Sequence, residues 1–146
     1  MNFCPAKIQD PSKSNIEEIM NVVLVDDSPL VRERVANIIS EIPGVIVIGE
    51  AGNSFEAIAV VRKTKPAVVI LDIKMPGESG LQVLRKLKNE FAELRIIMLT
   101  NYSDSQYKAE CLMHGADYFL SKSDEFDKLP EVFSKLGKSQ KSKFNN

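Results

Sequence analysis

The chain has 146 residues and a formal net charge of −1, with 44% hydrophobic and 27% charged residues. This size and balance predict one domain with short terminal extensions. The near-neutral charge gives no electrostatic basis for binding nucleic acid or an anionic membrane. No apolar run approaches the ~20 residues that a membrane-spanning helix needs. Only two cysteines occur, without a framework of spaced pairs, which favours a reduced, cytoplasmic setting.

The first 20 residues are rich in Pro, Ser, Asn and Lys and are predicted to be an N-terminal extension. They lack the positive region and apolar stretch of a signal peptide. The first strand is predicted at 22–25, where an apolar run ends at Asp26 and Asp27. Ser28 and Pro29 then favour a helix start, as a hydroxyl N-cap followed by a proline at the first helical position.

The stretch from Val68 to Gly80 indicates a buried strand that ends at an acid. Four apolar residues, three of them β-branched, run directly into Asp72, and Met75-Pro76-Gly77 then favours a loop. In an open parallel sheet, ligands bind beyond the carboxyl ends of the strands. Asp72 is therefore predicted to lie at a ligand-binding edge.

The remaining pattern alternates strands with helices. Further strands are predicted at 45–48, 96–99 and 118–120, and helices at 29–42, 53–65, 80–90, 103–114 and from Ser123 or Asp124 onward. Five β-α units indicate an α/β fold with a doubly wound parallel sheet covered on both faces. Residues 138–146 form a basic tail that is predicted to be disordered.

Polar residues follow four of the predicted strands: Asp26 and Asp27, Asp72, Thr100, and Lys122. Because the carboxyl ends of parallel strands meet at one edge, we expect these side chains to converge there. Three converging carboxylates favour a hard divalent cation, and Mg²⁺ fits best because it takes one or two carboxylates plus a phosphate. A lysine and a hydroxyl beside them can stabilise a moving phosphoryl group.

Four motifs in order, VLVDDS, VVILDIKMPGESG, IIMLTN and GADYFLSK, resemble the receiver domain of two-component response regulators. The resemblance covers residues 21–137. It implies a flavodoxin-like fold with five strands in the order 2-1-3-4-5 and five helices. It also implies a phosphorelay protein whose only reactions are its own phosphorylation and dephosphorylation.

The resemblance assigns expected roles to individual residues. Asp72 is the expected phospho-acceptor, and Lys122 is the expected lysine that binds a phosphoryl oxygen. The expected Mg²⁺ ligands are Asp26, Asp27, Asp72 and the backbone carbonyl of Lys74. Thr100 and Phe119 are the expected switch residues.

The implied partners are a sensor histidine kinase or a histidine phosphotransfer protein, and a downstream protein. The downstream protein would be reached through the face formed by the fourth helix, fifth strand and fifth helix. Neither nucleic acid nor membrane is an expected partner of this chain, and a monomer or a phosphorylation-dependent dimer is expected.

The sequence departs from the usual family pattern at several positions. Ser123 stands where proline commonly follows the lysine, and Asn101 stands where a small residue usually follows the switch hydroxyl. We hypothesise that Lys74, Asn101 and Tyr102 slow hydrolysis of the phosphorylated form, because such positions border the attacking water in similar proteins.

Three alternatives remain open on the sequence alone. The first is the receiver portion of a DNA-binding regulator whose output domain is absent. The second is a phosphohydrolase of the haloacid dehalogenase type, although Asp72-Ile73-Lys74 lacks the second acid of the Asp-x-Asp motif. The third is a receiver-like docking module that is never phosphorylated, which the intact set of acids disfavours.

Overall fold

The structure is a computed structural model that describes residues 19–101 and 105–145, with side chains described as far as residue 137. Five parallel strands form one sheet in the order β2-β1-β3-β4-β5. The strands are β1 (Met20–Val25), β2 (Val45–Ala51), β3 (Val68–Leu71), β4 (Arg95–Thr100) and β5 (Tyr118–Ser121). The predicted doubly wound sheet and its strand order are therefore confirmed.

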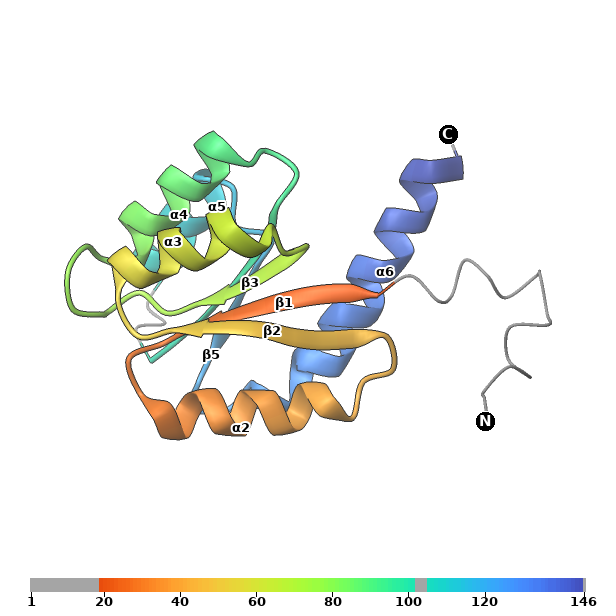
Figure 1. The fold of residues 1–146 in the computed structure, drawn as a ribbon, viewed down its shortest axis with the longest axis horizontal. Helices are drawn as coiled ribbons and strands as arrows, with labels where there is room; N and C mark the ends of the chain where they lie inside the picture. Colours follow the sequence, from red (N-terminus) through yellow and green to blue (C-terminus); the bar gives the residue numbers. More distant parts are fainter. Residues whose placement is uncertain (1–18, 102–104, 146) are drawn as a thin grey trace.

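Helices cover both faces of the sheet, as Figure 1 shows. One face carries α3 (Ser54–Thr64), α4 (Gly80–Glu90) and α5 (Ser105–Met113). The other carries α2 (Pro29–Ser40) and α6 (Leu129–Asn145), which follows a short 3₁₀ helix, η2 (Phe126–Lys128). None of the helices in the described part of the chain has the length and apolar character needed to cross a membrane.

The core is divided into two layers because successive strand side chains point to opposite faces. Val23, Val69 and Ile96 pack with the α3–α5 layer, while their neighbours Val22, Val68 and Ile97 pack with α2 and α6. All four residues of β3 are buried. A central strand covered on both faces must be apolar along its whole length, which is the pattern that predicted it.

Side chains fix the start of three helices. The Ser28 hydroxyl accepts a hydrogen bond from the Val31 N–H (3.2 Å), and the Asn53 side chain accepts one from the Glu56 N–H (2.8 Å). Ser79 and Gln82 form a reciprocal capping box at the start of α4. These caps tie the helix N-termini to the strand ends that precede them, and so they position the loops around Asp26 and Asp72.

The C-terminal part differs from the prediction in two ways. Neither Ser123 nor Asp124 caps the last helix; a turn and η2 come first, and α6 begins at Leu129. Pro130 explains this start, because proline has no N–H to donate and is best placed in the first turn of an α-helix. The backbone of α6 is helical through Asn145, over most of the 138–146 tail that was expected to be disordered. That tail has no proline to end the helix.

The bounds of β1 and β2 also differ from the prediction. β1 begins at Met20, inside the expected N-terminal extension, and β2 continues to Ala51. Pairing explains both extensions, because Met20 pairs with Val45 and Val25 pairs with Ala51. A register shift between Val22 and Val23 inserts an extra residue in β2. The first 18 residues of the expected extension lie outside the described part of the chain.

Candidate functional site

Four strand ends deliver the predicted polar residues to one edge of the sheet. Asp26 follows β1, Asp72 follows β3, Thr100 ends β4 and Lys122 follows β5. All four strands are parallel neighbours, so their carboxyl ends face the same way. The strand order therefore brings Asp26, Asp72, Thr100 and Lys122 to the same edge of the sheet, as predicted.

Lys122 joins two of the acids directly. Its Nζ lies 2.5 Å from an Asp26 carboxylate oxygen and 2.8 Å from an Asp72 carboxylate oxygen. The side chains of all three residues are 7–8% exposed. An ammonium group shared by two buried carboxylates compensates one of their two negative charges, which burial would otherwise make costly.

Burial shifts the pKa values of this group. Removal of the Asp26 carboxylate from water raises its pKa, and the hydrogen bonds from Lys122 and the Ser28 N–H offset only part of that effect. Burial alone would lower the pKa of Lys122, but its hydrogen bonds to Asp26 and Asp72 raise that pKa above the ordinary lysine value. Lys122 is therefore protonated at neutral pH.

Two backbone contacts hold the acids in place. The Ser28 N–H donates to the second oxygen of Asp26 (2.9 Å), and the Ile73 N–H donates to Asp72 Oδ1 (2.7 Å). The Asp72 N–H donates to the Val25 carbonyl (3.1 Å), which ties the ends of β3 and β1 together. The carboxylates are consequently oriented before any ligand arrives.

Asp27 completes an acidic cluster. One carboxylate oxygen from each of Asp26, Asp27 and Asp72 lies within 4.8 Å of the others, and Asp27 is exposed while the other two are buried. Three oxygen ligands at a partly open edge fit a hard divalent cation, which keeps several waters in its coordination shell. The predicted acid trio is thus brought together.

The other predicted residues flank this cluster. Thr100 is fully buried at the end of β4, and the Lys122 N–H donates to its carbonyl oxygen (2.9 Å). Phe119 in β5 is half-buried and packs against the core layer beneath α3–α5. Lys74 is exposed in the loop after Asp72. Tyr102 lies outside the described residues.

Sequence analysis missed Arg32, which positions Asp26. The Arg32 guanidinium donates to the Asp26 carbonyl oxygen (2.5 Å) and to the Glu50 carboxylate (2.8 Å). It therefore links the ends of β1 and β2. The sequence could have indicated this role, because Arg32 lies in the first turn of a helix predicted to start at Pro29. Side chains in the first turn of a helix point back toward the end of the preceding strand.

Ser54 was also missed, and it anchors the loop that follows Asp72. The buried Ser54 hydroxyl accepts a hydrogen bond from the Glu78 N–H (2.9 Å), and the Ser54 N–H donates to the Pro76 carbonyl (3.4 Å). The start of α3 thus holds the loop between β3 and α4. Nothing in the spacing of these residues predicts a contact across 24 positions.

Comparison with known proteins agrees with this geometry. Residues 22–134 match the response regulator receiver domain family. The chain is 38% identical over 104 residues to the response regulator UvrY of Escherichia coli K12, an alignment that covers 71% of this chain and 48% of UvrY. It is 33% identical over 113 residues to the nitrate/nitrite response regulator protein NarL of the same organism, covering 77% of this chain and 52% of NarL.

Solved structures share the fold. The isolated REC domain of RcsB from Salmonella enterica serovar Typhimurium, in the presence of the phosphomimetic BeF3−, superposes with a TM-score of 0.79 at 28% identity, covering 83% of this chain and 90% of that one. A LuxR-family two-component response regulator from Aurantimonas sp. SI85-9A1 gives a TM-score of 0.78 at 28% identity, covering 84% and 87%.

A doubly wound parallel sheet with three acids and a lysine at one edge is the arrangement of a receiver-type domain. This chain belongs to the response regulator receiver domain family of two-component systems. The chain spans about half the length of the curated relatives it matches.

Proposed function

We propose that Asp72 accepts a phosphoryl group from a phosphohistidine of a sensor kinase or phosphotransfer protein. An Asp72 carboxylate oxygen would attack phosphorus as the bond from phosphorus to the histidine nitrogen breaks, leaving an aspartyl phosphate and a free imidazole. The observation that carries this proposal is the placement of Asp72, buried at a strand end between a fixed cation and two further carboxylates.

The residues of the cluster fit a bound Mg²⁺. Asp26, Asp27 and Asp72 would hold it, with the backbone carbonyl of Lys74 as a further ligand. When bound, the ion would neutralise negative charge on the transferring group. The fit is supported by the oxygen-only donor set and by the exposure of Asp27, which leaves room for the coordinated waters that Mg²⁺ retains.

Lys122 and Thr100 would stabilise the phosphorylated form. Lys122 already contacts Asp72, so its ammonium group can donate to a phosphoryl oxygen after a small movement. Thr100 supplies a hydroxyl donor from the neighbouring strand. The hydrogen bonds that both side chains would donate to phosphoryl oxygens are charge-assisted, and such bonds are stronger than those between neutral groups.

The signal would leave through the face formed by α5, β5 and α6. Movement of Thr100 toward the phosphoryl group would open space for Phe119 to turn inward, and the shape of this face would change. A downstream protein, in the cytoplasm, would read that change. A hydrolase of the haloacid dehalogenase type is not favoured, because the family match is to receivers and the second acid of that motif is absent.

The proposal is tested by intact mass spectrometry after incubation with acetyl phosphate and MgCl₂. We expect the mass to increase by one phosphoryl group, and Asp72→Asn to abolish the increase. Asp124→Asn is the matched control, since Asp124 is an exposed acid outside the acidic cluster. Unchanged labelling of the Asp72→Asn variant would refute the assignment.

Slow hydrolysis of the aspartyl phosphate is a second part of the proposal. Lys74 is an exposed, long side chain two residues after Asp72, and Asn101 is an exposed residue directly after Thr100. Replacement of Lys74, Asn101 and Tyr102 by alanine should speed loss of the phosphoryl group, followed by mass spectrometry after the phosphodonor is removed. An unchanged rate would show that these side chains do not restrict the attacking water.

A further inference from the structure

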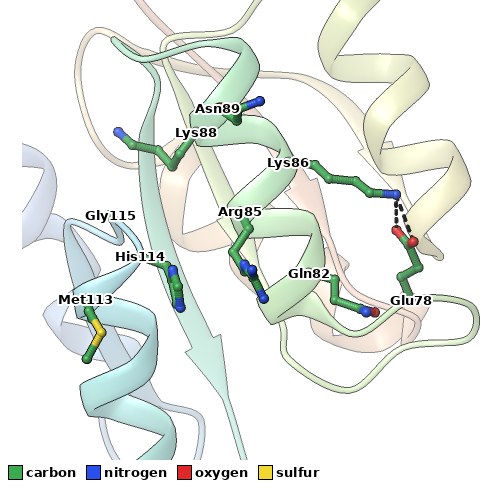
Figure 2. Close-up of a pocket in the computed structure, with 9 residues that line it drawn as sticks. All are labelled: Glu78, Gln82, Arg85, Lys86, Lys88, Asn89, Met113, His114 and Gly115. Atoms are coloured by element: carbon green, nitrogen blue, oxygen red, sulfur yellow. Dashed lines mark hydrogen bonds and ion pairs between the residues drawn. The ribbon is translucent and has the colours of Figure 1, made fainter.

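A basic groove lies between α4 and the end of α5, and none of the acids of the cluster lines it. Its volume is about 850 Å³, and Figure 2 shows the side chains that line it. Gln82, Arg85 and Lys86 come from α4, and Met113 and His114 come from the end of α5 and the turn after it. Most of these side chains are exposed, so the groove is an open surface and not an enclosed cavity.

Charge is unevenly distributed along this groove. Three cations, Arg85, Lys86 and Lys88, line it with a single carboxylate, Glu78. The whole chain carries 19 basic and 20 acidic residues, so the groove has an excess of positive charge that the chain as a whole lacks. An excess of one sign along a groove attracts a ligand of the opposite sign.

Two of the three cations already have partners within the protein. Lys86 forms an ion pair with Glu78 (2.8 Å), which Figure 2 shows at one end of the groove. Lys88 donates to the backbone carbonyls of Leu94 (2.6 Å) and Ala92 (3.3 Å), so it fixes the loop after α4. Arg85, within the described residues, makes no ion pair or hydrogen bond, and Figure 2 shows it in the middle of the groove near His114.

Met113 adds an apolar contact beside these charges. It is 76% exposed, although it is a large hydrophobic residue. A flexible thioether side chain suits a surface that receives side chains of different shapes. The groove therefore offers a guanidinium group for a carboxylate, an apolar side chain for an anchor residue, and the amides of Gln82 and Asn89 for a peptide backbone.

We propose that this groove binds an acidic segment of a partner protein, with a carboxylate of the segment on Arg85 and an apolar residue against Met113. A nucleic acid fits less well, because no Phe, Tyr or Trp lines the groove for base stacking and Glu78 lies within it. A drug-sized molecule also fits less well, since such ligands need enclosed and mostly apolar pockets. The proposal does not depend on phosphorylation of Asp72.

The test measures fluorescence anisotropy of a labelled peptide titrated with the full chain. The probe is a short peptide of Glu and Asp with one central Leu, and the matched peptide replaces each acid by its amide. We expect the acidic peptide to bind, the amide peptide to bind at least about tenfold more weakly, and added salt to weaken the acidic peptide's binding.

Variants then locate the binding. Arg85→Glu should weaken binding of the acidic peptide by about tenfold or more, because it replaces a cation with a repelling carboxylate. Met113→Ala should weaken it by a smaller factor. Lys63→Glu is the matched control, since it makes the same change of charge at an exposed position on α3, outside the groove, and should bind as the unaltered chain does. Circular dichroism melts confirm that each variant is folded.

Several outcomes would overturn the proposal. Absence of binding at low salt would do so, as would equal loss of binding in Arg85→Glu and Lys63→Glu, which would indicate a general charge effect. Equal affinity for the two peptides would show that acids are not recognised. Tighter, Arg85-dependent binding of a single-stranded oligonucleotide would assign the groove to nucleic acid instead.

Discussion

Lys122 contacts both buried acids of the site through one ammonium group. Lys122→Met should lower the free energy of unfolding by about 3 kcal/mol, because two buried carboxylates would lose their shared cation. Urea denaturation at neutral pH measures this loss.

Lys128→Met provides the control for that measurement. Lys128 pairs with Glu125 at the surface (3.1 Å), where water screens the two charges and the ion pair adds little to stability. A similar loss in the two variants would mean that Lys122 does not compensate buried charge.

Cys111 is a buried thiol that should resist modification. Burial, helped by the nearby charge of Glu110, raises its pKa to about 11, so the thiolate is scarce at pH 8. Iodoacetamide should label the native chain slowly and the urea-unfolded chain rapidly, in a Cys4→Ser background. Rapid labelling of the native chain would contradict the buried position.

The raised pKa of Cys111 also makes stability depend on pH. Between the ordinary thiol pKa and about 11 the folded state keeps a proton that the unfolded state loses, so the contribution of Cys111 to stability falls as pH rises.

Among individual residues, the sequence predicted the acids and the lysine of the site but not the residues that hold its loops in place. Asp26, Asp72 and Lys122 lie at or just after the ends of apolar runs, and parallel topology alone brings such residues together. Arg32 and Ser54 act through hydrogen bonds to backbone groups of other loops. Those contacts depend on loop paths that no local pattern specifies.

The first residue of α4, Gly80, lies very close to the backbone of Asp72 and Ile73 at the end of β3. A Cβ atom on Gly80 would collide with the Asp72 carbonyl oxygen and lie 2.7 Å from Ile73 Cα. Gly80→Ala should therefore cost about 3 kcal/mol of stability or displace Asp72, because backbone atoms cannot yield as a flexible side chain can. Thermal denaturation and acetyl phosphate labelling report the two effects.

Gly137→Ala, in α6, should raise stability where Gly80→Ala lowers it. A Cβ atom at Gly137 would meet no heavy atom within 4 Å. Alanine in a helix interior is favoured over glycine by about 0.5–1 kcal/mol, so this variant should melt at a higher temperature. If both glycine variants lowered stability equally, the close approach of Gly80 would not be the cause.

α5 should be the least protected helix of its layer. Cys111 is its single buried residue, whereas α4 buries Gly80, Val83, Leu84 and Leu87. Few buried contacts allow local opening, so amides of Ser105–Met113 should exchange with deuterium faster than those of Gly80–Glu90. Hydrogen exchange followed by mass spectrometry compares the two helices directly, and equal protection would rule out this difference in local stability.

Elements were predictable where a local signal marks their ends. β3 and α4 have the predicted bounds, because an apolar run ends at Asp72 and a serine cap precedes α4. The start of α6 was wrong because Pro130 delays the helix past two plausible caps. The length of β2 depended on its pairing with β1, which is a property of the sheet and not of the segment.

For the whole molecule, a bound divalent cation should raise stability. A ligand that binds only the folded state at ten times its Kd contributes about 1.4 kcal/mol. MgCl₂ should therefore raise the melting temperature relative to NaCl of equal ionic strength. Asp26→Asn should reduce this increase, while Asp127→Asn, an exposed acid in η2, should keep it. An equal increase in both variants would place the ion elsewhere.

The contact of Ser54 with the loop after Asp72 makes the two sides of the reacting edge unequal. The loop from β3 to α4 is hydrogen-bonded to α3 through Glu78 and Pro76, while α5, which follows β4, has one buried side chain. We expect a new charge on Asp72 to leave the β3–α4 loop nearly stationary and to shift α5. Phosphorylation would then move one side of the site only, and Ser54 would hold the other side in place.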